Sequence, residues 1–323
     1  MQAIPSQAML RVKPKLSRVL SAIVELVEII KSNRLRPPHA AKVFGRVDFI
    51  NTTLFGRVGR TGLGPVKRRQ HEAPNSDAWK LDPMLHGALV WLIEVLLRAP
   101  DRELQLDESL DDLILLYTDG SSEEKRDPPH GIGCVLVDLR DNTMEYTMAA
   151  VPPEVVEAWL PRKNYIGLVE LFAGPVALDT WSAKLANRHV IHFVDNNGAL
   201  VALVKGYSKV GDCIKIASDY WLRAASHRVF TYVDRVESKS NLSDGPSRFD
   251  VKLVESLGAK FIEPNLTYLG CPAPPRNPGE WFGTPARWSQ DIQKLHKQLF
   301  PAATHPPKSV GFTHMPKGCG KTT

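Results

Sequence analysis

The strongest constraint on the fold is the order of strand-like and helix-like stretches between residues 113 and 250. Short apolar runs bounded by turn residues indicate strands, and longer runs with apolar residues at helical spacing indicate helices. The order is three strands, a helix, a strand, a helix and a strand, at 113–121, 131–140, 144–151, 166–186, 189–197, 211–227 and 229–236. This order predicts an α/β fold in which a mixed five-stranded sheet is flanked by helices.

Four acidic residues take notable places in this layout. Asp119 closes the first strand, and Asp195 closes the fourth. Glu170 lies one turn into the long helix, and Asp244 follows the fifth strand. Open α/β sheets commonly place their sites at strand ends. If the first and fourth strands are neighbours, Asp119 and Asp195 emerge side by side, and a helix on the same face can bring Glu170 to them.

Converging carboxylates suit the hydrolysis of a phosphodiester. Two Mg²⁺ ions about 3.5–4 Å apart can activate a water molecule and stabilise the leaving oxygen. Mg²⁺, with Mn²⁺ as the alternative, takes carboxylate and phosphate oxygens as ligands. Without a cation, clustered carboxylates repel one another and some of their pKa values rise. The four acids therefore predict a site for divalent ions, two in number.

Each acid also has an ordinary structural explanation. Asp119 precedes a glycine and can belong to a turn. Asp195 can cap a helix that begins near Gly198. Asp244 can begin a helix. Their joint placement on one strand and helix order favours the metal site over these separate explanations.

Several short motifs resemble those of ribonuclease H domains. YTDGS (117–121) and GIGCVLV (131–137) are similar to the opening strands, and VELFA (169–173) and FVDNNGAL (193–200) to the next two motifs. RVESKSNLSDGPSR (235–248) resembles the closing motif of such domains in retroelement polyproteins. The resemblance covers about residues 113–249. It implies a ribonuclease H-like endonuclease for the RNA strand of RNA–DNA hybrids, with catalytic and metal-binding residues Asp119, Glu170, Asp195 and Asp244.

One departure from that family keeps a second function open. Cellular ribonucleases H carry a histidine in the loop before the last aspartate, and residues 235–241 contain none. His227 lies upstream, where capping a helix C-terminus explains it. The alternative is a catalytically inactive module with the same fold that binds nucleic acid or a partner protein, since a fold alone does not decide function.

Residues 1–109 are predicted to form a basic and mostly helical segment. Helices are expected at 16–31 and at 83–98. Pro37 and Pro38 are expected to end the first of them. The glycines within 44–69 favour turns, and 99–111 is expected to be a linker. VFGRVDFINTTLFGRVGRTGLGPVKRR (43–69) resembles the thumb or connection of retroelement reverse transcriptases. No Tyr-x-Asp-Asp motif is present, so the resemblance implies the C-terminal part or a remnant of such an enzyme, with other parts of a polyprotein as partners.

The first 71 residues contain fourteen Lys and Arg against three acidic residues, although the whole chain has a net charge of only +6. Such a basic arm either neutralises the phosphates of a nucleic acid or forms a solvated surface or targeting tail. The candidate nucleic-acid contacts are Ser121, Asn196, Asn241 and Arg248 beside the acids, and Arg57, Arg60, Lys67, Arg68 and Arg69 in the arm.

Residues 251–323 are predicted to form a proline-rich, largely irregular tail. The ending GCGKTT has Met315 where a P-loop needs its first glycine, so nucleotide binding is not expected there. Four cysteines without a CxxC pair favour a reducing compartment, the nucleus or cytoplasm. No apolar run reaches the roughly 18 residues of a membrane span, so no membrane partner is expected.

Overall fold

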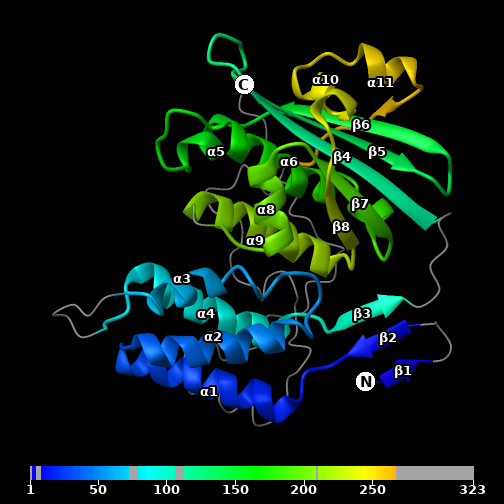
Figure 1. Cartoon of the computed structure of the whole chain (residues 1–323). Coiled ribbons are helices and arrows are strands. Elements are labelled where there is room, and N and C mark those ends of the chain that lie inside the picture. Colours follow the sequence, from blue (N-terminus) through cyan, green and yellow to red (C-terminus); the bar gives the residue numbers. More distant parts are fainter. Residues whose placement is uncertain (1, 5–8, 73–78, 106–111, 209, 267–323) are drawn as a thin grey trace, which may run out of the picture.

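The computed structural model describes residues 2–4, 9–72, 79–105, 112–208 and 210–266. The rest of the predicted tail, 267–323, lies outside the described residues. Within them, an N-terminal helical segment packs beneath a larger sheet domain (Figure 1). The predicted fold class is confirmed, because the sheet domain is a mixed sheet with helices on both of its faces.

The sheet domain contains six strands in the order β8-β7-β4-β5-β6-β9. Strand β4 pairs with β5 in the antiparallel sense and with β7 in the parallel sense, so the first and fourth predicted strands are neighbours. The short β9 is a sixth strand that pairs with β6 and comes from the stretch expected to be tail. The strands are β4 (Leu113–Ser122), β5 (His130–Asp138), β6 (Thr143–Ala150), β7 (His189–Val194), β8 (Phe230–Arg235) and β9 (Lys260–Phe261).

Helices cover the two faces of the sheet in different ways. On one face α6 packs on β4 and on α9, and on the other face α10 packs on β4, β5 and β6. Trp181 ends α6 and separates it from α7, so the long helix expected at 166–186 is two helices, and Pro175 lies inside α6 without ending it. The helices are α5 (Pro153–Glu157), α6 (Ile166–Thr180), α7 (Ser182–Leu185), α8 (Asn197–Lys205), α9 (Gly211–Ser226), α10 (Asp244–Ser247) and α11 (Lys252–Ser256).

The helical segment differs from expectation in three places. Pro37 and Pro38 begin α2 instead of only ending the preceding helix, because the first turn of a helix tolerates proline. That helix continues through Gly45, so the turns begin only after it. The expected linker contains β3, which pairs with β2 in a three-stranded sheet. The elements are β1 (Gln2–Ile4), β2 (Met9–Val12), α1 (Leu16–Ser32), α2 (Pro37–Asn51), α3 (Leu63–Arg69), α4 (Pro83–Arg98) and β3 (Arg102–Gln105).

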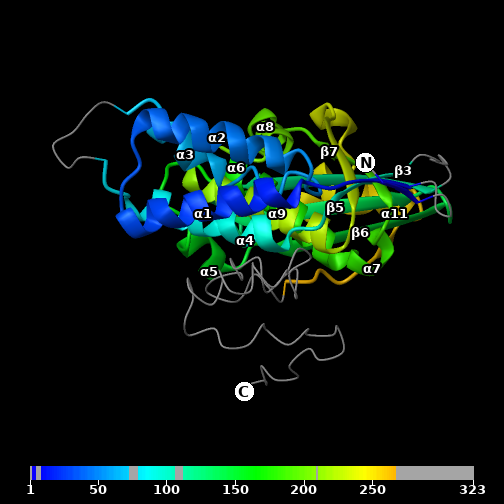
Figure 2. The ribbon, with the colours of Figure 1, turned by 90° about the horizontal axis from the view of Figure 1, so that it is seen from below.

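The helical segment and the sheet domain share one core. Leu54, Phe55 and Val58 from the turn after α2 are buried in the same apolar cluster as the sheet domain's helices. Gly56, with a φ of +58°, lies against the ring of Trp221, where a Cβ would be only 2.8 Å from the ring. The helices α1 to α4 run beneath α8 and α9 (Figure 2). The two parts therefore pack as a single body.

Candidate metal centre

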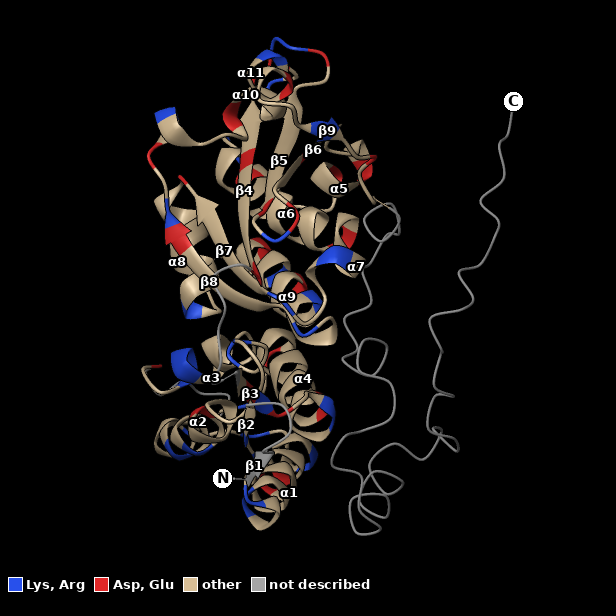
Figure 3. Ribbon diagram, turned by 90° about the vertical axis from the view of Figure 1, so that its right-hand side faces the viewer, with Lys and Arg blue, Asp and Glu red and all other residues tan. Residues whose placement is uncertain are grey.

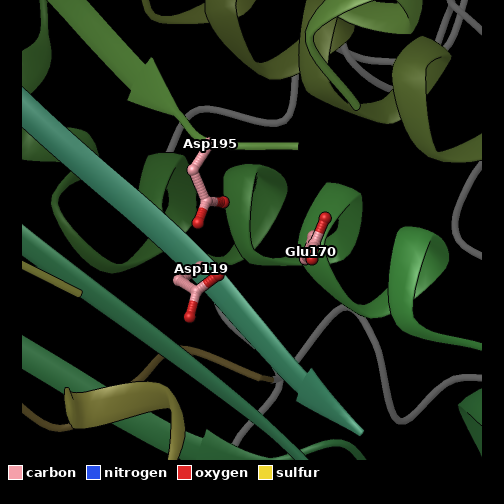
Figure 4. Close-up of side chains that lie close together, drawn as sticks. All are labelled: Asp119, Glu170 and Asp195. Carbon is pink, nitrogen blue, oxygen red and sulfur yellow. The ribbon is translucent and has the colours of Figure 1, made fainter. Parts of the chain in front are cut away.

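Three of the four predicted acids come together at one end of the sheet. Asp119 lies within β4, Asp195 directly follows the neighbouring β7, and Glu170 lies in the second turn of α6. Each offers a carboxylate oxygen, and these three oxygens all lie within 4.8 Å of one another. Figure 4 shows the three side chains gathered between β4, the end of β7 and α6. We call this group the carboxylate triad.

Close packing of β4 on α6 brings Glu170 to the strand. A Cβ at Gly120 would lie 2.5 Å from the backbone nitrogen of Glu170, a separation that real side chains do not allow. Glycine therefore permits the helix to approach the strand. Because side chains alternate between the faces of a strand, Asp119 points to the opposite face from Gly120. The turn expected at this glycine is absent, since β4 continues to Ser122.

Asp195 does not cap α8, although the sequence left that explanation open. Asn196 caps α8, and its side-chain oxygen accepts hydrogen bonds from the backbone nitrogens of Gly198 and Ala199 at 2.6 and 3.1 Å. The side chain of Asn196 also bonds to Glu170. The capping function therefore falls to Asn196, and the carboxylate of Asp195 is left to the triad.

Ser247 is a site residue that sequence reasoning did not single out. Its Oγ lies 2.7 Å from Asp119 Oδ2 and 2.9 Å from the backbone oxygen of Asp244. The bond lowers the pKa of Asp119, so the hydroxyl of Ser247 donates to the ionised form of this carboxylate. Gly133 allows this contact, because a Cβ there would be 2.2 Å from the nitrogen of Ser247. The sequence offered one signal for this contact, the two glycines of GIG (131–133), because the second of them, Gly133, faces α10.

Burial and mutual repulsion raise the pKa values of two acids of the triad. The pKa of Asp119 is raised to about 7, chiefly by burial, with a further increase from the charge of Asp195 and an opposing effect of the Ser247 hydrogen bond. The pKa of Glu170 is raised to about 8 by burial and then by the charges of Asp119 and Asp195. Glu170 Oε2 is buried and has no hydrogen-bond partner among the described residues. Among the described residues neither acid forms a salt bridge, although the charges of Asp119 and Arg248 attract each other over a longer distance.

Asp244 lies near the triad but is not one of its members. It is the first residue of α10, as the ordinary explanation expected, and its side chain is 45% exposed. Its Oδ1 pairs with Nε of Arg248 at 3.3 Å, and Arg248 also pairs with Glu123. The charge of Asp244 nevertheless contributes to the raised pKa of Asp119.

Two predicted contact residues beside the acids are used inside the protein. Ser121 is 1% exposed, donates to the backbone oxygen of Ser247 at 2.5 Å, and accepts from Arg126. Asn241 is 5% exposed and donates to the backbone oxygen of Thr118 at 3.3 Å. Both residues fix the α10 region against β4, and neither presents its polar group at the surface.

The basic residues of the arm fall into two groups. Arg69 is buried and donates to the backbone oxygens of Leu35, Trp79 and Lys80, so it holds the helical segment together. Lys67 and Arg68 are exposed, and Arg57 and Arg60 are half-buried. Figure 3 shows the basic residues of α3 on the part of the helical segment that faces the sheet domain. Among the described residues, no helix is long and apolar enough to cross a bilayer.

Comparisons with known proteins give limited likenesses. No protein-family model matches the chain, and no curated protein matches it. Among solved structures, it resembles the N-terminal RNase H domain of a Mycobacterium tuberculosis protein, solved as a fusion with maltose-binding protein. The two are 14% identical over 46% of this chain and 99% of that chain, with a TM-score of 0.32. RNase H1 from Halobacterium salinarum is also 14% identical, over 43% of this chain and 98% of that chain, with a TM-score of 0.31.

Proposed function

We propose that the chain is a metal-dependent endonuclease that cuts the RNA strand of RNA–DNA hybrids, as part or remnant of a retroelement reverse transcriptase. The observation that carries the proposal is the carboxylate triad, in which three separate elements bring oxygens within 4.8 Å of one another. Structural ion pairs do not explain this grouping, because its members share one sign of charge. The retroelement origin rests on the sequence motifs alone.

The triad fits a divalent cation. Its ligand atoms are carboxylate oxygens, which Mg²⁺ and Mn²⁺ prefer. Two observations support a cation here: Oε2 of Glu170 has no hydrogen-bond partner among the described residues, and the repulsion between the acids contributes to the raised pKa values of Asp119 and Glu170. When bound, one or two such ions would make water a better nucleophile and neutralise charge on the phosphate. Asp119, Glu170 and Asp195 are the proposed ligands, and Asp244 is proposed as an outer fourth acid.

Residues around the triad keep its carboxylates in place. Ser247 fixes one oxygen of Asp119, and Asn196 bonds to Glu170 while capping α8. Partners of this kind orient metal ligands and are typically worth 10–100-fold in metal affinity or activity. Arg248, half-exposed beside Asp244, is the proposed contact to a phosphate next to the one that is cut. Arg57, Arg60 and Lys67 are proposed to contact the hybrid farther away.

A cleavage assay with matched variants tests this function. The full chain is incubated with Mg²⁺ or Mn²⁺ and an end-labelled RNA–DNA hybrid, with duplex DNA, duplex RNA and single-stranded RNA in parallel. We expect cleavage of the RNA strand of the hybrid alone, loss of cleavage in Asp119→Asn, and full activity in the control Asp141→Asn. Asp141 is an exposed turn residue after β5.

Equal cleavage by the wild type and Asp119→Asn would overturn the assigned site. Tight, salt-dependent binding of the hybrid without cleavage by either protein would instead support the inactive nucleic-acid-binding module.

A further inference from the structure

A cavity lies where the helical segment meets the sheet domain, away from the carboxylate triad. Its volume is about 290 Å³. Phe44 and Asp48 of α2, Arg60, Lys67 of α3, and Tyr207 after α8 line it. The cavity therefore combines residues of both parts of the molecule, and two of them are basic.

Two aromatic rings hold the ammonium group of Lys67 in the cavity. Its Nζ lies 5.8 Å from the centroid of the Phe44 ring and 5.7 Å from that of the Tyr207 ring. The face of an aromatic ring attracts a cation but does not neutralise its charge. The N–H groups of the ammonium also stay available as hydrogen-bond donors. No carboxylate lies within salt-bridge distance of Lys67 in the part of the chain that the structure describes. Its ammonium is thus positioned and still able to bind an anion.

The surroundings of the cavity carry an excess of positive charge. Arg60 is only loosely paired with Asp48, at 3.8 Å. The pKa of the neighbouring Arg57 is lowered by burial and then by the charges of Arg60 and Arg102, and Asp48 only partly opposes this. Arg57 and Arg60 both pack against Gly206, at the C-terminal end of α8. An anion bound among these groups would relieve their mutual repulsion.

Helix α8 connects this cavity to the triad. Asn196 at its N-terminal end bonds to Glu170, and Gly206 at its C-terminal end touches the two arginines. The helix has nine residues, which at 1.5 Å per residue is about 14 Å. A duplex rises by about 3.4 Å per nucleotide of one strand, so a hybrid must extend over several nucleotides to reach both ends of the helix.

We propose that the cavity is an anchor for one backbone phosphate of the hybrid, bound by Lys67 and Arg60 several nucleotides from the phosphate that is cut. This inference deepens the proposed function and rests on it for the identity of the nucleic acid. The anchor selects hybrids long enough to span both sites. It also gives the helical segment a specific place in substrate binding, beyond a general attraction between charges.

Binding without catalysis separates this proposal from the nuclease assignment. The affinity for a 16-base-pair hybrid is measured with EDTA over a range of salt concentrations for the wild type, Lys67→Ala and Lys42→Ala. Lys42 is the matched control, because it is an exposed lysine of the helical segment and is not among the lining residues. We expect Lys67→Ala to reduce the slope of log K against log salt by about 0.9, the value of one phosphate contact. Lys42→Ala should leave the slope unchanged, and Tyr207→Leu should weaken binding in the same direction as Lys67→Ala.

Equal losses of affinity in Lys67→Ala and Lys42→Ala would overturn the anchor and indicate a diffuse basic surface. A site that binds inorganic phosphate through Lys67, with no effect of Lys67→Ala on the hybrid, would also overturn it. Failure of cleavage alone would count against the nuclease and leave these binding results to decide on the anchor.

Discussion

Ser247 donates a hydrogen bond of 2.7 Å to Asp119 Oδ2, across 128 positions of sequence. Ser247 is fully buried, and Asp119 is 3% exposed. The bond therefore joins α10 to the centre of the carboxylate triad, where water does not compete for it. Ser247 thus fixes the position of one carboxylate oxygen of Asp119.

Loss of this bond is expected to weaken metal binding. Ser247→Ala should lower the affinity for Mg²⁺ by about 10–100-fold, the usual effect of removing a group that orients a metal ligand. Isothermal titration calorimetry measures this directly. Ser256→Ala is the control, since Ser256 is exposed and bonds only to its own helix. Unchanged Mg²⁺ affinity in Ser247→Ala would show that the serine only packs α10 against the sheet.

Metal affinity should depend on pH. Asp119 and Glu170 have pKa values of about 7 and about 8 without metal, and each must lose its proton to bind a cation. The apparent affinity for Mg²⁺ should therefore rise between pH 6 and pH 8, by up to tenfold per pH unit for each proton released. Titrations at pH 6, 7 and 8 check this expectation. A constant affinity over that range would mean that the acids are ionised before the ion binds.

The metal-free protein should become less stable as pH rises. The native pKa values of Asp119 and Glu170 exceed those of unfolded chains, so the native state binds protons more tightly than the unfolded state. Stability from these groups is thus lost as pH rises from about 4 to about 8. Glu170→Gln removes one such group, so in EDTA its Tm should exceed the wild-type Tm at pH 8, and the difference should shrink toward pH 5. A lower Tm for this variant at pH 8 would contradict the raised pKa.

Substitution of Gly120 should disturb the triad through the backbone. A Cβ at this position would lie 2.5 Å from Glu170 N, so Gly120→Ala must push α6 away from β4. Overpacking of this kind costs about 1–3 kcal/mol, and a shift of about 1 Å in a catalytic group can cost about 100-fold in rate. Thermal denaturation and cleavage rates measure both effects. Gly87→Ala, on α4 with nothing within 4 Å of the added Cβ, is the control and should be neutral or stabilising.

Asp244→Asn should be milder than a change within the triad. Asp244 lies outside the group of three oxygens and is paired with Arg248 on a half-exposed surface. We therefore expect a smaller loss of Mg²⁺ affinity than in Asp195→Asn, measured in the same titration. An equal or larger loss would place Asp244 among the direct ligands of the bound state.

Periodicity and strand order predicted the sheet, and they predicted the meeting of Asp119 with Asp195 on the condition that the first and fourth strands are neighbours. Parallel neighbours end at the same edge, so residues at two strand ends are brought together by topology alone. Glu170 followed from its place on the first long helix. These inferences succeeded because they depend on local patterns and on a small number of permitted connections.

Contacts that form only between buried residues could not be predicted from the sequence. Ser121, Asn241 and Arg69 were interpreted as nucleic-acid contacts from their type and position, but each donates to backbone oxygens inside the protein. Polar residue types do not reveal whether a segment will fold over them. Ser247 was missed for the same reason, since its bond to Asp119 exists only once α10 has docked on the glycines of β5.

The contact of Trp221 with Gly56 makes the helical segment a structural part of the unit that contains the sheet domain. In a chain that began near residue 110, Trp221 would be exposed to solvent. The apolar surface against which Leu54, Phe55 and Val58 pack would be exposed as well. Uncovered apolar area of this kind promotes aggregation. Inactivity of such a shortened protein would consequently report on lost solubility and not on the chemistry of its acids.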